Sequence, residues 1–187
     1  MNILRQSGAA IRALIVLTVI LGVAYPLLMV GAGLLMPARA NGSMLKNGDE
    51  PVGSKLLAQP AGGPEWFQPR PSEGYWAGDA SGGSNLSPVS DELKQKMDER
   101  RAELEAANPG AGDVPPEALT ASSSGLDPQI SPEYARWQAP RVAAARGITE
   151  ERVNELIDDH TSKALLGFFG TDTVNVNELN YSLAYES

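Results

Sequence analysis

The sequence contains no cysteine and only one histidine, His160, among its 187 residues. Without cysteine the chain forms no disulfide, offers no thiolate to a metal ion and has no cysteine nucleophile. One histidine without cysteine also falls short of the ligand set of the usual zinc sites. These absences exclude thiol-dependent chemistry and the common zinc-dependent functions before any motif is considered.

Acidic residues are missing from the amino-terminal quarter of the chain, and the first acid in the sequence is Asp49. The net charge is −8, and beyond Arg5 and Arg12 there remain 13 basic residues against 23 acidic ones, a balance of −10. A nucleic-acid-binding protein needs a basic face. This composition therefore argues against nucleic acid as a partner.

Familiar catalytic motifs are also absent. The chain has neither a G-x-x-x-x-G-K-[ST] phosphate loop nor a G-x-S-x-G nucleophile elbow. The segment GDASGG, residues 78–83, is similar to the GDSGG around a serine-protease nucleophile, but Ala80 changes the spacing, and we interpret the segment as a glycine-serine turn. His160 lies on an apolar helix face, where a packing role is expected. We assign no catalytic residue and no metal ligand.

One long apolar run is present, ALIVLTVILGVAYPLLMVGAGLLM, residues 13–36, which contains no charge over 24 residues. A helix of this length measures roughly 36 Å, enough to cross a hydrocarbon core of about 30 Å. A cleaved signal peptide is the alternative, because Ala38-Arg39-Ala40 matches an A-x-A cleavage site. Signal-peptide cores usually run about 7–15 residues, so we expect a retained transmembrane helix in the lipid bilayer.

Basic residues flank this helix on both sides, with Arg5 and Arg12 before it and Arg39 and Lys46 after it. The positive-inside rule counts such residues near the membrane ends. The balance leans slightly toward a cytoplasmic amino terminus. We therefore expect residues 1–12 to form a cytoplasmic tail and the soluble part to lie outside the cytoplasm.

Small residues recur along the apolar run at helical spacing. On a helix of 3.6 residues per turn, one side collects five positions, namely Thr18, Gly22, Pro26, Met29 and Gly33. Close approach through small residues is a main source of helix association in lipid. These five positions are predicted to form a partner-packing face, although glycine is common in membrane helices for other reasons.

The remaining chain reads as a linker, residues 37–50, followed by one soluble α+β domain, residues 51–187. Ser90 is placed to cap a helix over 91–107, whose first turn carries acids that suit the helix dipole. Near the carboxyl end, alternating valines at 174 and 176 predict a strand. The length is sufficient for a single hydrophobic core.

Capping residues mark two further helices in the second half of this domain. Ser131, followed by proline at the first helical position, predicts a helix start. Pro140 is expected to interrupt that helix and Gly147 to end its second half. Thr149 is predicted to cap the next helix, and Asn177 a closing helical turn.

The segment ALTASSSGLDPQISP, residues 118–132, holds four serines, one threonine and two prolines. No base or metal ligand accompanies these hydroxyls, so a catalytic loop is not expected. Hydroxyl, aspartate and proline side chains form self-satisfied turns that make a stiff loop. Two interpretations stay open: a shaped surface for a partner, and a fold-stabilising turn that leads into the Ser131 cap.

With these segments identified, the chain resembles the C subunit of the bacterial Kdp potassium-transporting ATPase over nearly its whole length. The resemblance rests on the single N-terminal helix and on a series of ordered motifs. They are GSKLLAQ (53–59), FQPRPS (67–72), SGGSNLSP (81–88), LTASSSGLDPQISP (119–132), QAPRVAAARG (138–147), LIDDHT (156–161) and VNVNELN (174–180).

The resemblance implies an accessory, non-catalytic subunit of an ATP-driven potassium uptake complex in the bacterial inner membrane. The expected partners are the catalytic P-type ATPase subunit, whose nucleotide affinity the subunit raises, and a potassium-channel-like subunit. The chain itself is expected to bind no cofactor, although ATP is reached through the complex. By resemblance, Gln138 is tied to nucleotide contact. ATP is cytoplasmic, however, so a domain outside can act only through conformational coupling.

We also place a partner-docking loop at Ser124, Gly125, Leu126, Asp127 and Pro128, facing the channel-like subunit. Two residues depart from the family pattern: Ser123 replaces a usual glycine, and Gln129 a usual histidine. A membrane-anchored envelope protein acting alone, as a binding module or hydrolase, is the alternative function.

Overall fold

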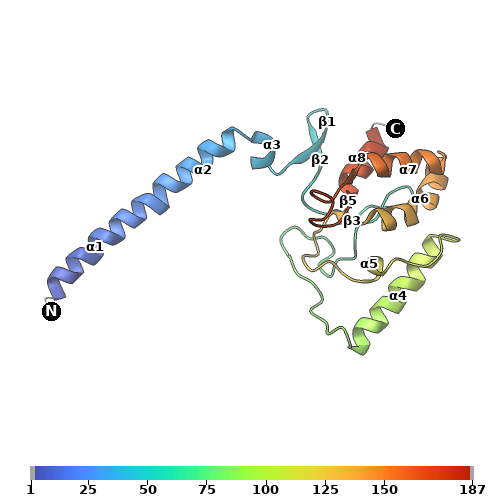
Figure 1. The fold of residues 1–187 in the computed structure, drawn as a ribbon, viewed down its shortest axis with the longest axis horizontal. Helices are drawn as coiled ribbons and strands as arrows, with labels where there is room; N and C mark the ends of the chain where they lie inside the picture. Colours follow the sequence, from blue (N-terminus) through green and yellow to red (C-terminus); the bar gives the residue numbers. More distant parts are fainter. Residues whose placement is uncertain (1–2, 186–187) are drawn as a thin grey trace. The chain divides into compact units, whose positions relative to one another are not determined.

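The structure, a computed structural model, describes residues 3–185 and divides into two compact units, Met1–Ser43 and Met44–Ser187. The first unit is a long apolar helix followed by a short one (Figure 1). It consists of α1 (Ile3–Val19), the π-helical turn η1 (Ile20–Ala24), α2 (Tyr25–Leu34) and α3 (Pro37–Ala40). The stretch Ile3–Leu34 is 32 residues long and apolar enough to span a membrane.

The wide turn η1 is explained by Pro26. Proline has no N–H to donate to the carbonyl of Gly22, and its ring crowds that oxygen. The chain responds with a wider turn, in which the N–H of Tyr25 donates to the carbonyl of Ile20 five residues earlier. The predicted packing face assumed a uniform helix, and this premise was wrong because the wide turn separates Thr18 from Pro26.

The second unit begins with a hairpin in which β1 (Met44–Asn47) pairs antiparallel with β2 (Glu50–Ser54). The prediction of a linker over 37–50 was therefore wrong, since α3 and this hairpin occupy most of it. Gly48, at φ +62°, begins the two-residue turn between the strands. The Asn-Gly-Asp sequence is a local hairpin signal that the linker interpretation overlooked.

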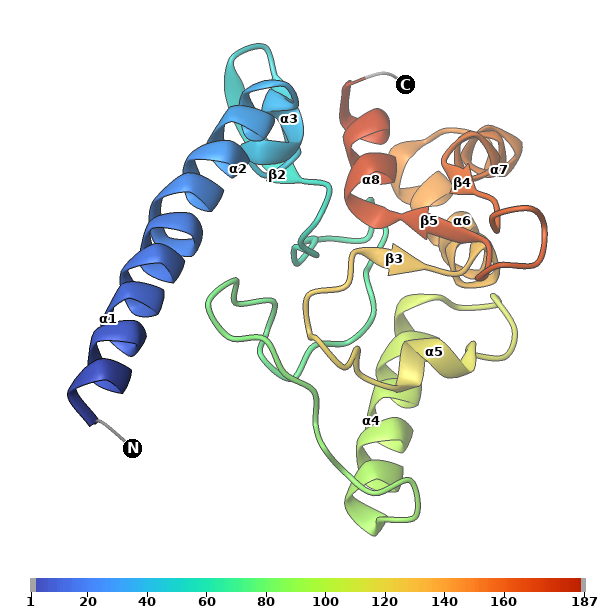
Figure 2. The same cartoon turned by 60° about the vertical axis from the view of Figure 1, so that its left-hand side comes forward.

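The rest of the second unit is an α+β arrangement, as predicted. The remaining elements are α4 (Asp91–Ala107), α5 (Pro116–Leu119), β3 (Gln129–Ile130), α6 (Pro132–Arg146), α7 (Glu150–Asp159), β4 (Thr161–Ser162), β5 (Thr173–Asn175) and α8 (Val176–Tyr185). The sheet is antiparallel in the order β3-β5-β4. Figure 2 shows α6, α7 and α8 gathered around this sheet and α4 with α5 on another side of the body.

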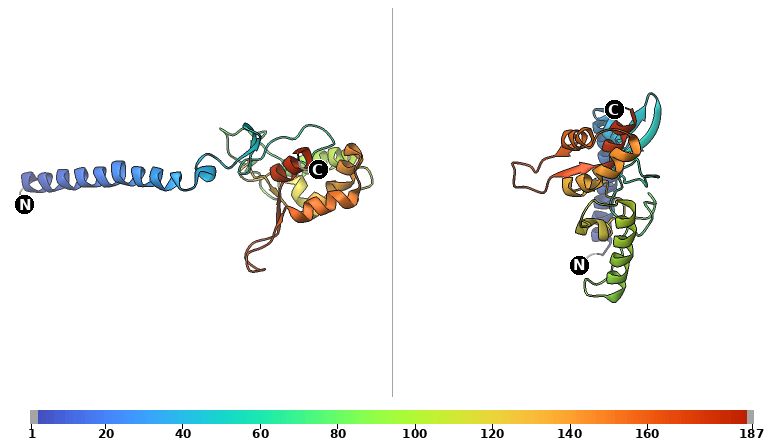
Figure 3. Two further views of the ribbon diagram at one scale, coloured as in Figure 1. Left: turned by 90° about the horizontal axis from the view of Figure 1, so that it is seen from above. Right: turned by 90° about the vertical axis from the view of Figure 1, so that its right-hand side faces the viewer.

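The hydrophobic core lies between these helices and the sheet. Its completely covered members include Phe67, Ile130, Val142, Ile157 and Leu179. The core draws on α5, α6, α7, α8 and the strands β3 and β5, and Phe67 joins it from the irregular segment over 55–90. In contrast, α4 has no buried residue. Figure 3 also shows the connection between β4 and β5 projecting away from the body.

Three of the four predicted side-chain caps are confirmed. The hydroxyls of Ser90, Ser131 and Thr149 each accept a hydrogen bond from the N–H three residues further on, at 3.2, 3.0 and 3.2 Å. This is the geometry that satisfies one of the orphan donors at a helix start. Gly147, at φ +69°, ends α6 in the left-handed conformation.

Two local predictions were wrong. Pro140 does not interrupt α6, because it lies on the exposed side of a continuous helix. The carbonyl that it cannot pair, that of Arg136, belongs to an exposed residue. Asn177 is not the cap of α8, since the side chain of Asn175 accepts the N–H groups of Asn177 and Glu178, both at 3.1 Å.

Candidate functional site

The loop over 122–128 makes backbone hydrogen bonds to four distant parts of the domain. The partner residues lie in separate parts of the chain and are not joined to the loop by a common sheet or helix. The pairs are Ser122 N–H to the Pro71 carbonyl (2.9 Å), Gly82 N–H to the Ser124 carbonyl (2.9 Å), Ala58 N–H to the Leu126 carbonyl (2.9 Å) and Val176 N–H to the Pro128 carbonyl (2.8 Å). We call residues 122–128 the hub loop.

Gly125 sits at the most crowded point of the hub loop. Its φ is +68°, and a Cβ placed on it would lie 3.0 Å from both the Gly82 carbonyl oxygen and the Ser72 Oγ. Gly83 also packs closely against this loop, since an added Cβ would lie 3.1 Å from the Cα of Ser123. The backbones meet this closely only because both positions are glycine.

The predicted docking residues are mostly engaged inside the domain. Gly125 and Pro128 are buried, and Ser124, Leu126 and Asp127 are partly buried. The carboxylate of Asp127 accepts the N–H of Gln129 at 3.0 Å, and the Ser124 Oγ accepts the N–H of Leu126 at 3.1 Å. These contacts favour the fold-stabilising interpretation of the segment. The two departures from the family pattern, at 123 and 129, are exposed.

The structure places Gln138 in the interior of the domain, where it is 1 % exposed. Its Oε1 accepts the N–H of Gln68 and a guanidinium N–H of Arg141, both at 2.8 Å. Its Nε2 donates to the Gln68 carbonyl at 3.1 Å. Both polar atoms of the amide therefore have partners within the chain.

Arg141, one turn further along α6, extends this network. Its Nε donates to Asn108 Oδ1 at 2.7 Å, at the end of α4, and its Nη1 donates to the carbonyls of Trp66, at 3.0 Å, and Pro64. Burial lowers the pKa of the guanidinium from its ordinary value, although arginine stays charged in proteins. The residue locks three segments together, and the sequence analysis did not single it out.

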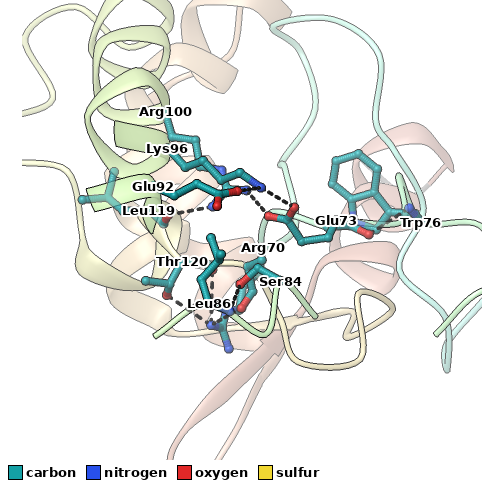
Figure 4. Close-up of polar contacts among 12 residues, drawn as sticks. Arg70, Glu73, Trp76, Ser84, Leu86, Glu92, Lys96, Arg100, Leu119 and Thr120 are labelled. Carbon is teal, nitrogen blue, oxygen red and sulfur yellow. Dashed lines mark hydrogen bonds and ion pairs between the residues drawn. The ribbon is translucent and has the colours of Figure 1, made fainter. Parts of the chain in front are cut away.

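A second charged cluster surrounds Glu73 (Figure 4). Its carboxylate accepts from Lys96 Nζ at 2.9 Å and from Arg100 Nη2 at 2.7 Å, both on α4. Arg100 also donates to the Leu119 carbonyl at 3.0 Å. Hydrogen bonds from Lys96 and then from Arg100 are the main causes that lower the pKa of Glu73. The cluster holds the exposed helix α4 against the loop at 69–76.

This cluster lines an open cavity of about 610 Å³ together with Tyr75 and Trp76. Both aromatic residues have positive φ, +52° and +57°, a conformation that is uncommon for bulky side chains. The N–H of Trp76 donates to Ser72 Oγ at 3.0 Å, which holds this turn in place. The segment has no sequence signal for such a turn, and it was missed.

Both ring nitrogens of His160 lie within hydrogen-bonding distance of groups of the fold. One ring nitrogen, Nδ1, lies 2.8 Å from the Leu156 carbonyl, and the other, Nε2, lies 2.8 Å from the Oγ of Ser182 on α8. A carbonyl in place of a carboxylate behind the ring does not make a catalytic triad. Among residues 3–185, no group of three His, Asp or Glu side chains is arranged to hold a metal ion.

The five positions of the predicted packing face are exposed in the first unit, apart from a partly buried Gly33. Thr18 lies directly below Gly22, where an added Cβ would meet its Cγ2 at 3.8 Å. Met29 and Gly33 line a shallow cavity between α2 and α3. Along the chain, Thr18 thus lies before η1, Gly22 within it, and Pro26, Met29 and Gly33 after it.

Within residues 3–185, these features define a protein with one span-length apolar helix and one α+β domain, whose most connected polar residues serve the fold. The chain belongs to the family described as KdpC: K+-transporting ATPase, c chain, which matches residues 7–185.

Individual relatives agree with this assignment. A potassium-transporting ATPase KdpC subunit from Kineococcus radiotolerans is 51 % identical over 188 residues, covering 97 % of this chain and 94 % of the relative. The KdpC subunits of Caulobacter vibrioides and Serratia proteamaculans are 48 % and 47 % identical. They cover 89 % and 91 % of this chain, and the matches span 86 % and 93 % of the relatives. The chain is therefore a subunit of a potassium-transporting ATPase complex.

The crowding at Gly125 predicts that Gly125→Ala destabilises the domain more than the same substitution at a glycine that also has a positive φ but has free space around it. The matched control is Gly110→Ala, where φ is +83° but an added Cβ meets nothing within 4 Å. The control should lose about 1–2 kcal/mol of unfolding free energy, and Gly125→Ala about 1–3 kcal/mol more. Urea unfolding of the full chain in detergent, followed by tryptophan fluorescence, measures both. Equal losses would show that the hub loop is not tightly constrained.

The lowered pKa of Glu73 predicts a pH-dependent contribution to stability. Since the folded-state pKa lies below the ordinary value of 4.5, the unfolded chain takes up the proton first on acidification. Glu73→Gln should therefore cost on the order of 1 kcal/mol at neutral pH. The difference from wild type should persist down to about pH 4.5 and shrink as the pH falls through the lowered pKa.

Urea unfolding at a series of pH values measures this difference. Glu103→Gln is the control, because it removes a carboxylate from an exposed position of α4, the helix that supplies the partners of Glu73. A Glu73→Gln deficit that stays constant into acid would contradict the role of the two cationic partners.

Proposed function

We propose that this chain is a non-catalytic subunit that stabilises the assembled potassium-transporting ATPase and raises the nucleotide affinity of its catalytic subunit. The partners are the P-type ATPase subunit and the potassium-channel-like subunit of the same complex. The chain is anchored in the inner membrane of a bacterium by its N-terminal helix, and its soluble domain lies outside the cytoplasm. ATP acts on the complex without binding this domain.

The burial of Gln138 carries this proposal. The residue tied to nucleotide by family resemblance is 1 % exposed, and its amide is already paired with Gln68 and Arg141. A nucleotide could reach it only if those bonds broke and α6 separated from the 64–68 segment. The domain therefore influences nucleotide affinity through its shape, which is a coupling between distant sites.

The other polar residues of the domain support a non-catalytic role. His160 and Ser182 join α7 to α8, and Glu73 holds α4 to the loop at 69–76. Each of these groups has a structural partner that accounts for its position. The span-length helix, preceded by Arg5 and Arg12, supports a cytoplasmic amino terminus with the domain on the opposite side.

A site-specific protease tests orientation and coupling in one experiment. Its recognition sequence is inserted between Gly42 and Ser43, next to the boundary of the two units. Protease is then added to the non-cytoplasmic face of membranes that contain the complex. We expect the soluble domain to be cut from its membrane helix and to leave the complex on washing, because its remaining contacts lose the high effective concentration that the tether provides. The ATP concentration for half-maximal hydrolysis should then rise severalfold, because the domain no longer favours the nucleotide-binding conformation.

Vesicles carrying the complex without the inserted site, treated in the same way, are the control. Failure of the protease to cut from outside, together with cleavage from the cytoplasmic face, would refute the orientation. Cleavage from outside with an unchanged ATP dependence would refute the coupling.

A further inference from the structure

The connection between β4 and β5 ends in an exposed apolar cluster. Its sequence, ALLGFFG over 164–170, contains no charged or hydrogen-bonding side chain, and we call it the apolar tip. Four large side chains are exposed there: Leu165 (69 %), Leu166 (74 %), Phe168 (70 %) and Phe169 (58 %). Figure 3 shows that this connection projects from the body. Hairpin ends are normally polar, and contiguous exposed apolar side chains mark contact sites.

The backbone of the apolar tip has a defined shape. Leu165 and Phe169 exchange two backbone hydrogen bonds, at 3.0 and 2.9 Å. Leu166 has a φ of +56°, which is costly for a leucine, and Gly167 follows with +78°. The rings of Phe168 and Phe169 pack together, with centroids 4.3 Å apart. A turn that presents four apolar side chains in a fixed arrangement suits insertion into a complementary pocket.

The base of the apolar tip is fixed by Asp172. Its carboxylate accepts from Lys163 Nζ and from the Ala164 N–H, both at 2.9 Å. These two hydrogen bonds lower the pKa of Asp172, so the carboxylate is charged at neutral pH. The pair leaves no net charge at the base.

The charge distribution favours a protein over the bilayer as the occupant of this surface. Segments that insert into the membrane interface usually carry lysine or arginine beside their apolar residues, which attract anionic lipids. Here Lys163 is neutralised by Asp172, and the chain beyond Arg12 has 13 basic residues against 23 acidic ones. An anionic membrane surface would repel such a domain, whereas an apolar protein pocket would not.

We propose that the apolar tip inserts into an apolar pocket of another subunit of the potassium-transporting ATPase and thereby anchors the soluble domain to the complex. This inference rests on the proposed function, because it assumes that the chain assembles with those subunits. It assigns the anchoring contact to residues 164–170 and leaves the hub loop its role within the fold.

The experiment compares Phe168→Glu with Val89→Glu in the intact complex. Val89 is 91 % exposed and belongs to a separate loop, so it places the same charge on the surface away from the apolar tip. The affinity-tagged chain is purified from membranes in detergent, and the co-purifying subunits are quantified. Loss of one buried phenylalanine contact should weaken association roughly tenfold to a hundredfold. Val89→Glu should assemble like wild type.

A photoreactive phenylalanine analogue at 168 identifies the neighbour directly, with the analogue at 89 as control. We expect a covalent adduct with another subunit of the ATPase from position 168 only. Tryptophan fluorescence of each purified variant monitors folding, and since Phe168 is 70 % exposed, its substitution should leave the unfolding midpoint unchanged. Loss of assembly accompanied by a lowered midpoint, without a subunit adduct from 168, would count against the proposal.

The possible failures are distinguishable. If the wild-type chain does not purify with ATPase subunits, the proposed function itself is wrong. If wild type and Phe168→Glu assemble equally and position 168 gives no protein adduct, only the anchoring role is overturned. Adducts from 168 confined to lipid, or to a second copy of this chain, would overturn it in favour of those occupants.

Discussion

The soluble domain depends on the hydrogen bonds that the hub loop makes to segments with little secondary structure of their own. Within the described chain, residues 55–90 contain no helix or strand, so their backbone N–H and C=O groups must find hydrogen-bond partners outside such elements. Ala58, Pro71 and Gly82 each find one in the loop over 122–128. A short serine- and glycine-rich loop thus takes the place of a sheet ladder in holding the first half of the domain to the second.

The same constraint bears on the function of the domain. Gln138 and Arg141 bind the 64–68 segment as the hub loop binds its neighbours, and Glu73 fastens α4 to that assembly. A domain locked in this way changes little on its own and can act as a rigid unit on its partners. An effect on a distant nucleotide site then requires a firm attachment to those partners, and the apolar tip is the surface best suited to provide one.

Local signals predicted the helices well. The hydroxyl caps at 90, 131 and 149 and the glycine at 147 fixed the ends of α4, α6 and α7, because a cap is decided by the few residues around it. The α+β class of the domain and the apolar helix were also predicted from patterns that extend over only a short stretch of sequence. Pro140 was misjudged because its effect depends on whether the unpaired carbonyl faces solvent, which only the packed helix decides.

The long-range contacts could not be predicted from the sequence. Apart from Gln138, the partners of Arg141 lie 33 to 77 residues away, and no periodicity links positions so distant. The hub loop was identified as stiff from its composition, but its partners at 58, 71, 82 and 176 were not. The exposure of the apolar tip was equally hidden, since LLGFF reads in sequence like any short buried strand.

The most direct test of this account is amide hydrogen exchange on the full chain in detergent. The N–H groups of Ala58, Gly82 and Val176 lie in loops or at element ends and donate to carbonyls of the hub loop. The N–H of Ser122, in the hub loop itself, donates to the Pro71 carbonyl. If the hub loop holds the domain together, these amides exchange slowly and open as one cooperative unit with the core of α6. Fast exchange, independent at the four positions, would contradict it.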